Sequence, residues 1–442
     1  MHFNPPVLNR AKRKNTAWTF AMQFCLILLL VPFMLIAQES QPQAYTQYKG
    51  EVVDAENGKP LVFASISLEN NNISTVTNTD GEFSLKVPDN LQDPRVQVSF
   101  LGYTSKVIPL ASLRQEENTI ALEIAITELP EVNISAPRNA VVLVKETLRN
   151  KGANYVSDPT LMTAFYRETI KRRRRNVSLS EAVVNIYKAP YAANRNDVVE
   201  LYKARKSTDY SKLDTLVLKL QGGPYNTLFV DIMKYPDYLF TDDSIDAYDF
   251  SFDRSTRIND QLVYVVNFKQ HPGITEPMYE GKLYIEAEQK VLTSAIFSLN
   301  ITNREQASRM FVRKKPQNAD VFPTQVAYRV DYMNKGGKWY YGYSNVFLEF
   351  KIDWDRKLFN SVYSLTCEMA VTDWVVNTEG DLPKGKQRLR PSVILADEAS
   401  GFSDPDFWGE YNIIEPEKSI ESAIRKIQRQ LKREPSGGPD TR

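Results

Sequence analysis

Short segments of alternating apolar and polar residues, separated by turns, fill the stretch from Tyr48 to Lys106. The turns include Gly58-Lys59-Pro60 and Asn78-Thr79-Asp80-Gly81, and Gly81 supplies the positive φ that a tight hairpin needs. Strands at this spacing, joined by turns of this composition, predict a small β-sandwich. Its expected core is formed by Val52, Val62, Ala64, Ile66, Leu68, Phe83, Leu85, Val87, Val98 and Phe100.

Longer alternating segments follow in the second half of the chain. From Thr324 to Met333 every second residue is apolar or aromatic, whereas Arg329 and Asp331 fall on the opposite face. A turn at 334–337 leads into a second alternating segment that ends at Trp354, and a hairpin is expected at 279–299. This pattern predicts a large antiparallel sheet with one apolar face.

The first 37 residues have the order of a targeting signal. Four basic residues lie between positions 10 and 14, an apolar run covers 17–37, and Gln38 begins a polar stretch. This order predicts a signal peptide at 1–37 that is cleaved after export, and Pro32 near the end of the run favours cleavage. The alternative is an uncleaved anchor, because about 20 apolar residues can span a bilayer. We therefore expect an exported protein, periplasmic or associated with the outer membrane.

The turn positions of the first module carry a family resemblance. They are Gly50-x-Val52, Gly58-x-Pro60-Leu61-x-x-Ala64-x-Ile66, Thr79-Asp80-Gly81-x-Phe83 and Phe100-x-Gly102-Tyr103. The pattern resembles the carboxypeptidase regulatory-like domain. That resemblance implies a transthyretin-like (prealbumin-like) β-sandwich, of a kind that precedes other domains in outer-membrane and secreted proteins of Bacteroidetes. It implies no catalytic residue.

Three further motifs extend the resemblance to a Bacteroidetes family of uncharacterised envelope proteins. They lie at 165–168 (Phe-Tyr-Arg-Glu), 220–224 (Leu-Gln-Gly-Gly-Pro) and 407–416, which begins with Phe407-Trp408. The hairpin at 279–299 also resembles part of the half-barrel of periplasmic lipoprotein carriers. The segment 129–137 resembles the linker that follows the sandwich in TonB-dependent receptors, although we expect this chain to be too short for their membrane barrel.

The expected organisation is mainly β, with a few helices. After the signal peptide come the sandwich at 46–126, a linker at 127–140, a β-rich domain at 141–432 and a disordered tail at 433–442. A helix should end the β-rich domain, because its apolar residues share one face. They are Ile420, Ala423, Ile424, Ile427 and Leu431.

Histidine and cysteine usage restricts the chemistry. The only histidines are His2 and His271, whereas a zinc peptidase needs several His or Cys ligands. His271 lies in a turn sequence and is expected to be an exposed loop residue. Removal of the signal peptide leaves Cys367 alone, so we expect no internal disulfide and a buried Cys367. We predict no catalytic residue, metal or cofactor.

An acidic run lies at Asp242, Asp243, Asp246, Asp249 and Asp253. Its spacing does not match an EF-hand loop, so a solvated loop is favoured over a calcium site.

Two groups of residues are candidates for binding. Trp339, Tyr341, Phe350 and Trp354 would line a pocket for an acyl chain or a sugar, and the alternative is ordinary core packing. Lys171, Arg172, Arg173, Arg174 and Arg175 would bind phosphate groups or polyanions, and the alternative is a solvated hairpin tip.

These observations favour a non-catalytic cell-envelope protein that binds a lipid, a glycan or an outer-membrane protein partner. A net charge of +1 gives no reason to expect nucleic acid binding. One alternative is a hydrolase that uses paired carboxylates such as Glu168 and Glu181. A structural or assembly scaffold is the other. The oligomeric state is left open.

Overall fold

The computed structural model describes residues 44–125, 139–173, 175–208, 221–241, 244–258, 261–312, 317–355, 360–383, 385, 388–401 and 407–417. The predicted signal peptide, most of the linker, and the predicted C-terminal helix and tail lie outside these residues. Among the helices that the structure describes, none is both long and apolar enough to cross a membrane. The described residues from Tyr45 onward belong to one compact unit.

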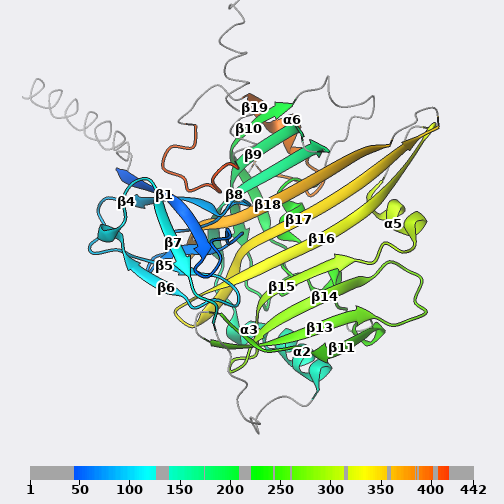
Figure 1. Cartoon of the computed structure of the whole chain (residues 1–442), viewed down its shortest axis with the longest axis horizontal. Coiled ribbons are helices and arrows are strands. Elements are labelled where there is room, and N and C mark those ends of the chain that lie inside the picture. The colour runs from blue at the N-terminus through cyan, green and yellow to red at the C-terminus, as the bar shows by residue number, and fades with distance from the viewer. Residues whose placement is uncertain are drawn as a thin grey trace, which may run out of the picture. The chain divides into compact units, whose positions relative to one another are not determined.

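The sandwich at the start of this unit consists of two small sheets (Figure 1). In one sheet β1 pairs antiparallel with β4 and parallel with β7, and the other sheet has the order β3-β2-β5-β6. The strands are β1 (Tyr45–Asp54), β2 (Ser65–Leu68), β3 (Ser74–Val76), β4 (Glu82–Pro88), β5 (Arg95–Ser99), β6 (Lys106–Pro109) and β7 (Asn118–Leu122). Apolar side chains from both sheets form one core, as the alternation predicted.

One predicted core position of the sandwich was wrong. Val62 is half-buried, and Leu61 occupies the core instead. The reason is the backbone of Phe63, whose φ of 63° interrupts the extended conformation and shifts the alternation by one residue. The predicted turn at Gly81 is confirmed: φ is 77°, and a Cβ there would lie 2.7 Å from Cβ of Pro60.

The large sheet has the strand order β11-β13-β14-β15-β16-β17-β18-β8-β9-β10-β19, with β12 paired to β13, and Figure 1 shows this order from bottom to top. Both predicted hairpins are confirmed, because β14 pairs with β15 and β16 with β17, each in antiparallel register. The strands are β8 (Thr160–Arg172), β9 (Arg175–Lys188), β10 (Val198–Thr208), β11 (Tyr248–Phe252), β12 (Thr256–Ile258), β13 (Gln261–Gln270), β14 (Tyr279–Glu286), β15 (Val291–Leu299), β16 (Ala319–Lys335), β17 (Lys338–Trp354), β18 (Ser361–Val376) and β19 (Ser400–Gly401).

The apolar face of this sheet is covered by short helices and by residues 221–241 and 244–247 of the connection between β10 and β11. Val326 and Val330 point into the resulting core, as predicted. Gly222 in the turn before α4 has a φ of 119°, and a Cβ there would lie 2.1 Å from Oδ1 of Asn226, which explains a glycine in the motif at 220–224. The helices are α2 (Ala140–Arg149), α3 (Lys151–Asn154), α4 (Tyr225–Leu228), α5 (Arg304–Phe311) and α6 (Leu395–Glu398), with 3-10 turns η1 (Leu110–Ser112), η2 (Pro236–Tyr238) and η3 (Ile245–Ala247).

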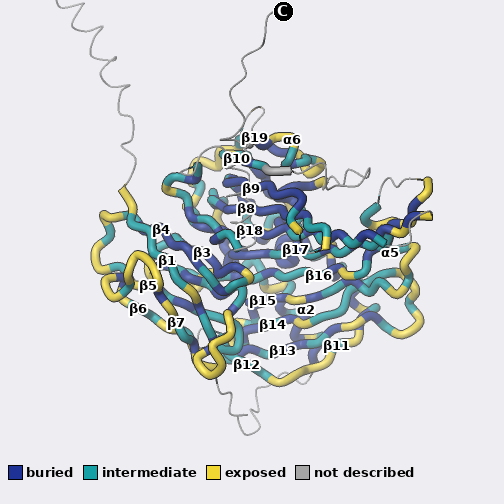
Figure 2. The backbone as a smooth tube through the Cα atoms, turned by 45° about the horizontal axis from the view of Figure 1, so that its top comes forward, coloured by how far each residue is buried: buried dark blue, intermediate teal, exposed yellow. Residues whose placement is uncertain are grey.

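The opposite face of the sheet is not simply solvated, contrary to the expectation of one apolar face. Strand β3 of the sandwich and residues 407–417, which we call the C-terminal strap, lie on it. There Phe165 packs with Trp408 and Ile414 in a second apolar cluster. Both faces of the central strands β8 and β9 are therefore buried, as Figure 2 shows in dark blue.

Candidate functional site

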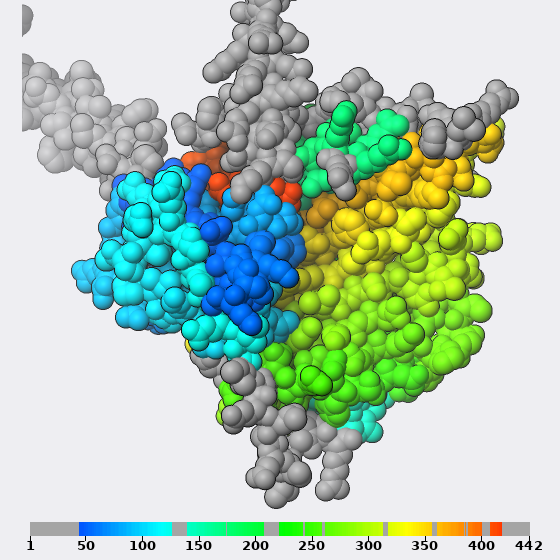
Figure 3. All heavy atoms as spheres, in the orientation of Figure 1, coloured from blue at the N-terminus to red at the C-terminus, as the bar shows by residue number. Residues whose placement is uncertain are grey.

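A cleft of about 450 Å³ lies between the sandwich and the large sheet. The sandwich contributes β2, the turn after it and β5, and the sheet contributes parts of β15, β16 and β17. Hydroxyl and amide side chains are frequent in the sandwich wall, including Ser65, Ser67, Gln97 and Ser99. The volume falls in the range of about 300–1,000 Å³ that is typical of small-molecule sites. Figure 3 shows the sandwich, in blue and cyan, against the yellow and orange strands of the sheet.

Alternation along β16 places charged side chains in the wall of this cleft. Successive residues of a strand point to opposite faces, so Val330 enters the core while Arg329 and Asp331 face the sandwich. The sequence predicted this separation of faces. It gave no signal that the charged face would be covered.

Arg329 is fixed by contacts on several sides. Its Nε donates a hydrogen bond to Oδ2 of Asp331 at 2.7 Å, and Oδ1 of Asp331 accepts from the hydroxyl of Ser294 at 2.5 Å. Its guanidinium carbon lies 5.5 Å from the ring centroid of Phe63 and 5.9 Å from that of Phe100. The side chain is only 17% exposed. The cleft therefore holds a guanidinium whose position is set before any ligand arrives.

Phe63 combines a strained backbone with a place in the cleft. A positive φ is unusual for a bulky residue, and such strain often marks a functional position. Its ring stacks on Tyr343 of β17 with a centroid distance of 5.0 Å. The unusual backbone thus presents an aromatic surface to both the sheet and the cleft.

Lys335 lines the same cleft at the end of β16. Its Nζ donates to the amide oxygen of Asn72, and it lies 5.9 Å from the ring centroid of Trp374. Burial lowers the pKa of Lys335. A positive charge is therefore held in a partly dehydrated position.

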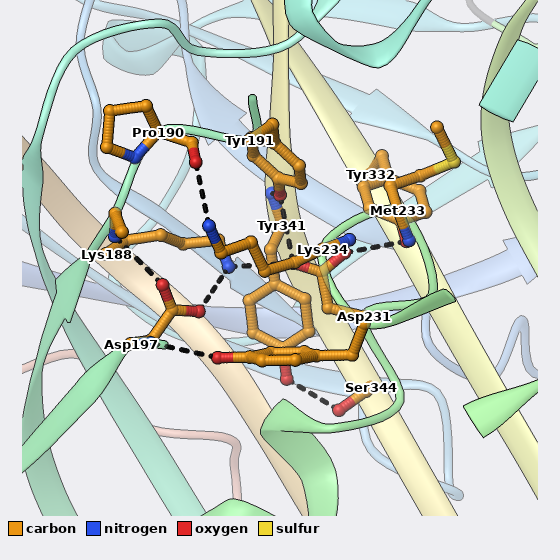
Figure 4. Close-up of polar contacts among 12 residues, drawn as sticks. Lys188, Pro190, Tyr191, Asp197, Asp231, Met233, Lys234, Tyr332, Tyr341 and Ser344 are labelled. Carbon is orange, nitrogen blue, oxygen red and sulfur yellow. Dashed lines mark hydrogen bonds and ion pairs between the residues drawn. The ribbon is translucent and has the colours of Figure 1, made fainter. Parts of the chain in front are cut away.

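A buried polar cluster lies on the other side of the sheet, inside the main core (Figure 4). Nζ of Lys188 lies 2.7 Å from Oδ2 of Asp197 and 2.7 Å from Oδ2 of Asp231. The hydroxyls of Tyr191 and Tyr332 donate to Asp231 at 3.1 and 2.9 Å. The three charged side chains are at most 2% exposed.

The charge of Lys188 is stabilised by its two partners. Burial opposes the charged form, but the attraction of Asp197 and Asp231 outweighs it and raises the pKa of Lys188. In contrast, burial lowers the pKa of the neighbouring Lys234 to about 8, and its Nζ donates to the carbonyl oxygens of Pro190 and Ala193. These satisfied, enclosed contacts indicate a structural cluster that joins β9 to the connection over the apolar face.

A second buried charge network lies beneath the C-terminal strap. Arg167 on β8 donates to Glu181 at 2.8 Å, to Glu368 at 3.2 Å and to the carbonyl oxygen of Ile414 at 2.7 Å. Arg205 forms an ion pair with Glu181 at 2.7 Å. Burial opposes ionisation of Glu181, but the two arginines outweigh it and lower its pKa. The motifs at 165–168 and 407–416 thus meet in space.

The strap is bonded to the sandwich as well. The side-chain amide of Asn412 accepts from the backbone N–H of Lys86 at 2.7 Å and donates to its carbonyl oxygen at 3.1 Å. Asn78 donates to the carbonyl oxygen of Glu415 at 3.2 Å, and Lys49 pairs with the Glu415 carboxylate at 3.1 Å. The strap is therefore a direct connection between the sandwich and the large sheet.

The four aromatic residues predicted to face a ligand lie in the main core. Trp339 donates to the side chain of Gln289 at 3.0 Å, and the hydroxyl of Tyr341 lies 2.6 Å from that of Ser344. Phe350 and Trp354 are buried in the same apolar cluster. None of the four belongs to the lining of the cleft described above. Their ligand-facing role stays a prediction.

The basic run lies at the tip of the β8–β9 hairpin. Lys171 pairs with Glu417 of the strap at 3.2 Å, and Arg172 lies over the ring of Tyr363 at 5.9 Å. Arg173 has a φ of 56° at the turn, Arg175 begins β9 and is exposed, and Arg174 lies outside the described residues. Anion binding by this run stays a prediction.

His271 and the acidic run lie at one edge of the sheet. His271 is 42% exposed, and its Nε2 lies 3.2 Å from Oδ1 of Asp249. Asp246 pairs with Lys145, Asp253 pairs with Lys282, and Asp242 and Asp243 lie outside the described residues. Among the residues with described positions, no three His, Cys, Asp or Glu side chains are placed to hold a metal ion.

The carboxylates of the hydrolase hypothesis lie on opposite faces of the sheet. Glu181 is opposite Arg167 in the β8–β9 register, whereas Glu168 is opposite Ser180. Glu168 is buried beside Tyr166, whose hydroxyl lies 3.2 Å from Oε2, and beside Cys367, which is buried as predicted. The two carboxylates therefore do not face each other across a cleft.

Glu168 should make stability depend on pH. Burial raises its pKa from 4.5 to about 7, so the folded state binds this proton more tightly than the unfolded state. The stabilisation of the folded state by this proton is fully present below the pKa that Glu168 has in the unfolded state. It is lost as pH rises through the pKa that Glu168 has in the folded state. As pH rises from about 5 to about 8, the wild type should lose about 2–3 kcal/mol of unfolding free energy that the Glu168→Gln variant does not lose. Urea unfolding at both pH values measures this, with the exposed Glu305→Gln as control; parallel pH profiles for wild type and Glu168→Gln would contradict it.

Comparisons with known proteins bear on the sandwich. No curated protein matched this chain. A solved domain from Vibrio parahaemolyticus, described as an outer membrane lipoprotein-sorting protein domain, is 10% identical, with a TM-score of 0.24 over 55% of this chain and 94% of that one. A LolA superfamily protein from Nitrosomonas europaea is 11% identical, with a TM-score of 0.21 over 54% and 94%. A DUF1329 family protein from Desulfovibrio piger is 11% identical, with a TM-score of 0.24 over 54% and 94%.

The family profile that matches this sequence covers residues 48–134. It agrees with the resemblance found in the glycine and proline positions of the first module. Residues 48–134 are a CarboxypepD_reg-like domain.

Proposed function

We propose that this chain is a non-catalytic binding protein of the cell envelope, and that the cleft between the sandwich and the large sheet holds a glycan. The observation that carries the proposal is the lining of the cleft. Ser65, Ser67 and Gln97 provide hydrogen-bonding groups beside the aromatic rings of Phe63 and Phe100. Sugars offer hydroxyls for such groups and apolar C–H surfaces for such rings. Export is supported by the predicted signal peptide.

A lipid is a weaker candidate for this cleft. An acyl chain needs a predominantly apolar lining, whereas this one carries serine, asparagine and charged side chains. The aromatic residues on the apolar face, such as Trp339 and Tyr341, are enclosed in the core and bonded within it. A lipid is therefore an alternative outcome of the test.

Filling the cleft tests the proposal. Ser67→Trp places a large side chain in the cleft, and Ser251→Trp places the same side chain on the exposed strand β11 as control. Isothermal titration calorimetry measures binding of chitotetraose, tetragalacturonate and vesicles of phosphatidylethanolamine to the purified chain. We expect an oligosaccharide to bind, and Ser67→Trp to weaken it at least about tenfold.

The control should bind like the wild type. Failure of every oligosaccharide to bind, or equal binding by wild type and Ser67→Trp, would overturn the proposal. Binding of vesicles alone would favour the lipid alternative.

A further inference from the structure

We infer that the cleft selects acidic glycans and that Arg329 binds a carboxylate of the ligand. The inference rests on the proposed function, because it names the ligand class of the same cleft.

Arg329 has hydrogen-bond donors that the described protein does not use. A guanidinium carries five N–H donors, and Nε of Arg329 uses its own on Asp331. Within the described part of the chain, Nη1 and Nη2 have no hydrogen-bond acceptor. These two nitrogens form an edge with parallel N–H groups, and such an edge matches the two oxygens of a carboxylate.

The guanidinium is also preorganised. Asp331 holds its Nε edge, and Ser294 in turn holds Asp331, so Asp331 acts as a positioning residue. The rings of Phe63 and Phe100 lie within 6 Å of the guanidinium carbon at 5.5 and 5.9 Å. A side chain restrained in this way loses little freedom on binding, and its partial burial strengthens an ionic hydrogen bond.

The remaining charges of the cleft favour an anion. Lys335 adds a second cation that contacts a neutral amide oxygen. The carboxylate of Glu69, which also lines the cleft, forms an ion pair with Arg95 at 3.1 Å. The hydroxyls of Ser65 and Ser67 lie in the opposite wall, where they suit the neutral part of a sugar. A sugar acid therefore matches the cleft better than a neutral sugar.

A matched pair of ligands tests the carboxylate. Tetragalacturonate and its methyl ester differ only in whether the carboxylates are free, and calorimetry with the full chain gives both affinities. The wild type should bind the acid at least about tenfold more tightly than the ester. Arg329→Met should lose most of the preference, because only Lys335 remains to attract a carboxylate, and Arg329→Lys should keep more of it because it keeps the charge and loses the fork. Arg309→Met, on the exposed surface of α5, is the control and should behave like the wild type.

Several results would overturn the inference. Equal binding of acid and ester by the wild type, or an unchanged preference in Arg329→Met or Arg329→Lys, would remove the role of the guanidinium. Stronger competition by inorganic phosphate than by acetate would assign the site to a phosphate. In each case binding of the ester or of chitotetraose would leave the proposed function intact, whereas failure of all three oligosaccharides would remove both. Circular dichroism and thermal unfolding verify that each variant is folded.

Discussion

Replacing Arg167 by methionine should lower the free energy of unfolding by about 3–5 kcal/mol. The arginine side chain is 1% exposed and bonds to Glu181, Glu368 and the carbonyl oxygen of Ile414. Methionine replaces only the unbranched stem of arginine and has no hydrogen-bond donor, so it leaves buried acceptors without a donor. Glu181 keeps Arg205, so Glu368 and the strap carbonyl should account for most of the loss.

Urea unfolding followed by tryptophan fluorescence measures the effect. The matched control is Arg309→Met, which breaks the ion pair between Arg309 and Glu305. Because these two side chains are 74% and 77% exposed, the change should lower the free energy of unfolding by at most about 0.5 kcal/mol. Amide hydrogen exchange in residues 407–417 should also accelerate in Arg167→Met, because the strap loses a bond to β8. If the two variants unfold at the same urea concentration, the network does not hold the strap.

Replacing Lys188 by methionine should destabilise the protein by a similar amount, about 3–5 kcal/mol. The substitution leaves the carboxylates of Asp197 and Asp231, both 0% exposed, without their shared cation. Two uncompensated negative charges close together in the core disfavour the folded state more than either would alone. The same unfolding measurement applies.

A double variant separates charge from packing. Lys188→Met combined with Asp231→Asn should recover part of the lost stability, because it removes one of the two buried charges. Lys282→Met, which breaks the partly exposed pair with Asp253, is the control and should stay close to the wild type. A double variant less stable than Lys188→Met alone would contradict the electrostatic explanation.

Much of the architecture follows from local patterns. The alternation in β16 predicted that Val330 and Arg329 point to opposite faces, and the turn residues predicted the hairpins. The error at Val62 arose because the positive φ of Phe63 is a tertiary feature that alternation does not reveal. Local periodicity tells which face is apolar, but it does not tell what covers the other face.

At the candidate site, too, local periodicity does not tell which face of the sheet is covered. Trp339 and Phe350, which were predicted to face a ligand, lie on the apolar side of the sheet within the main core, and their ligand-facing role stays a prediction. Arg329 and Asp331 were assigned to the polar side of the same sheet, and that side forms the cleft. The sequence feature that could have indicated the cleft was an Arg-x-Asp pair on a strand, and such pairs are also common on solvated surfaces.

The strap has a consequence for the order in which the molecule assembles. Asn412 and Lys86 are 326 positions apart, so the sandwich emerges during synthesis long before the segment that attaches it to the sheet. Contacts between residues so far apart in the sequence form late in folding. The chain must lose the entropy of a large loop before the contact contributes any stabilisation. The sandwich should therefore reach its own fold as an independent early unit, and its final attachment should be a separate, slower step.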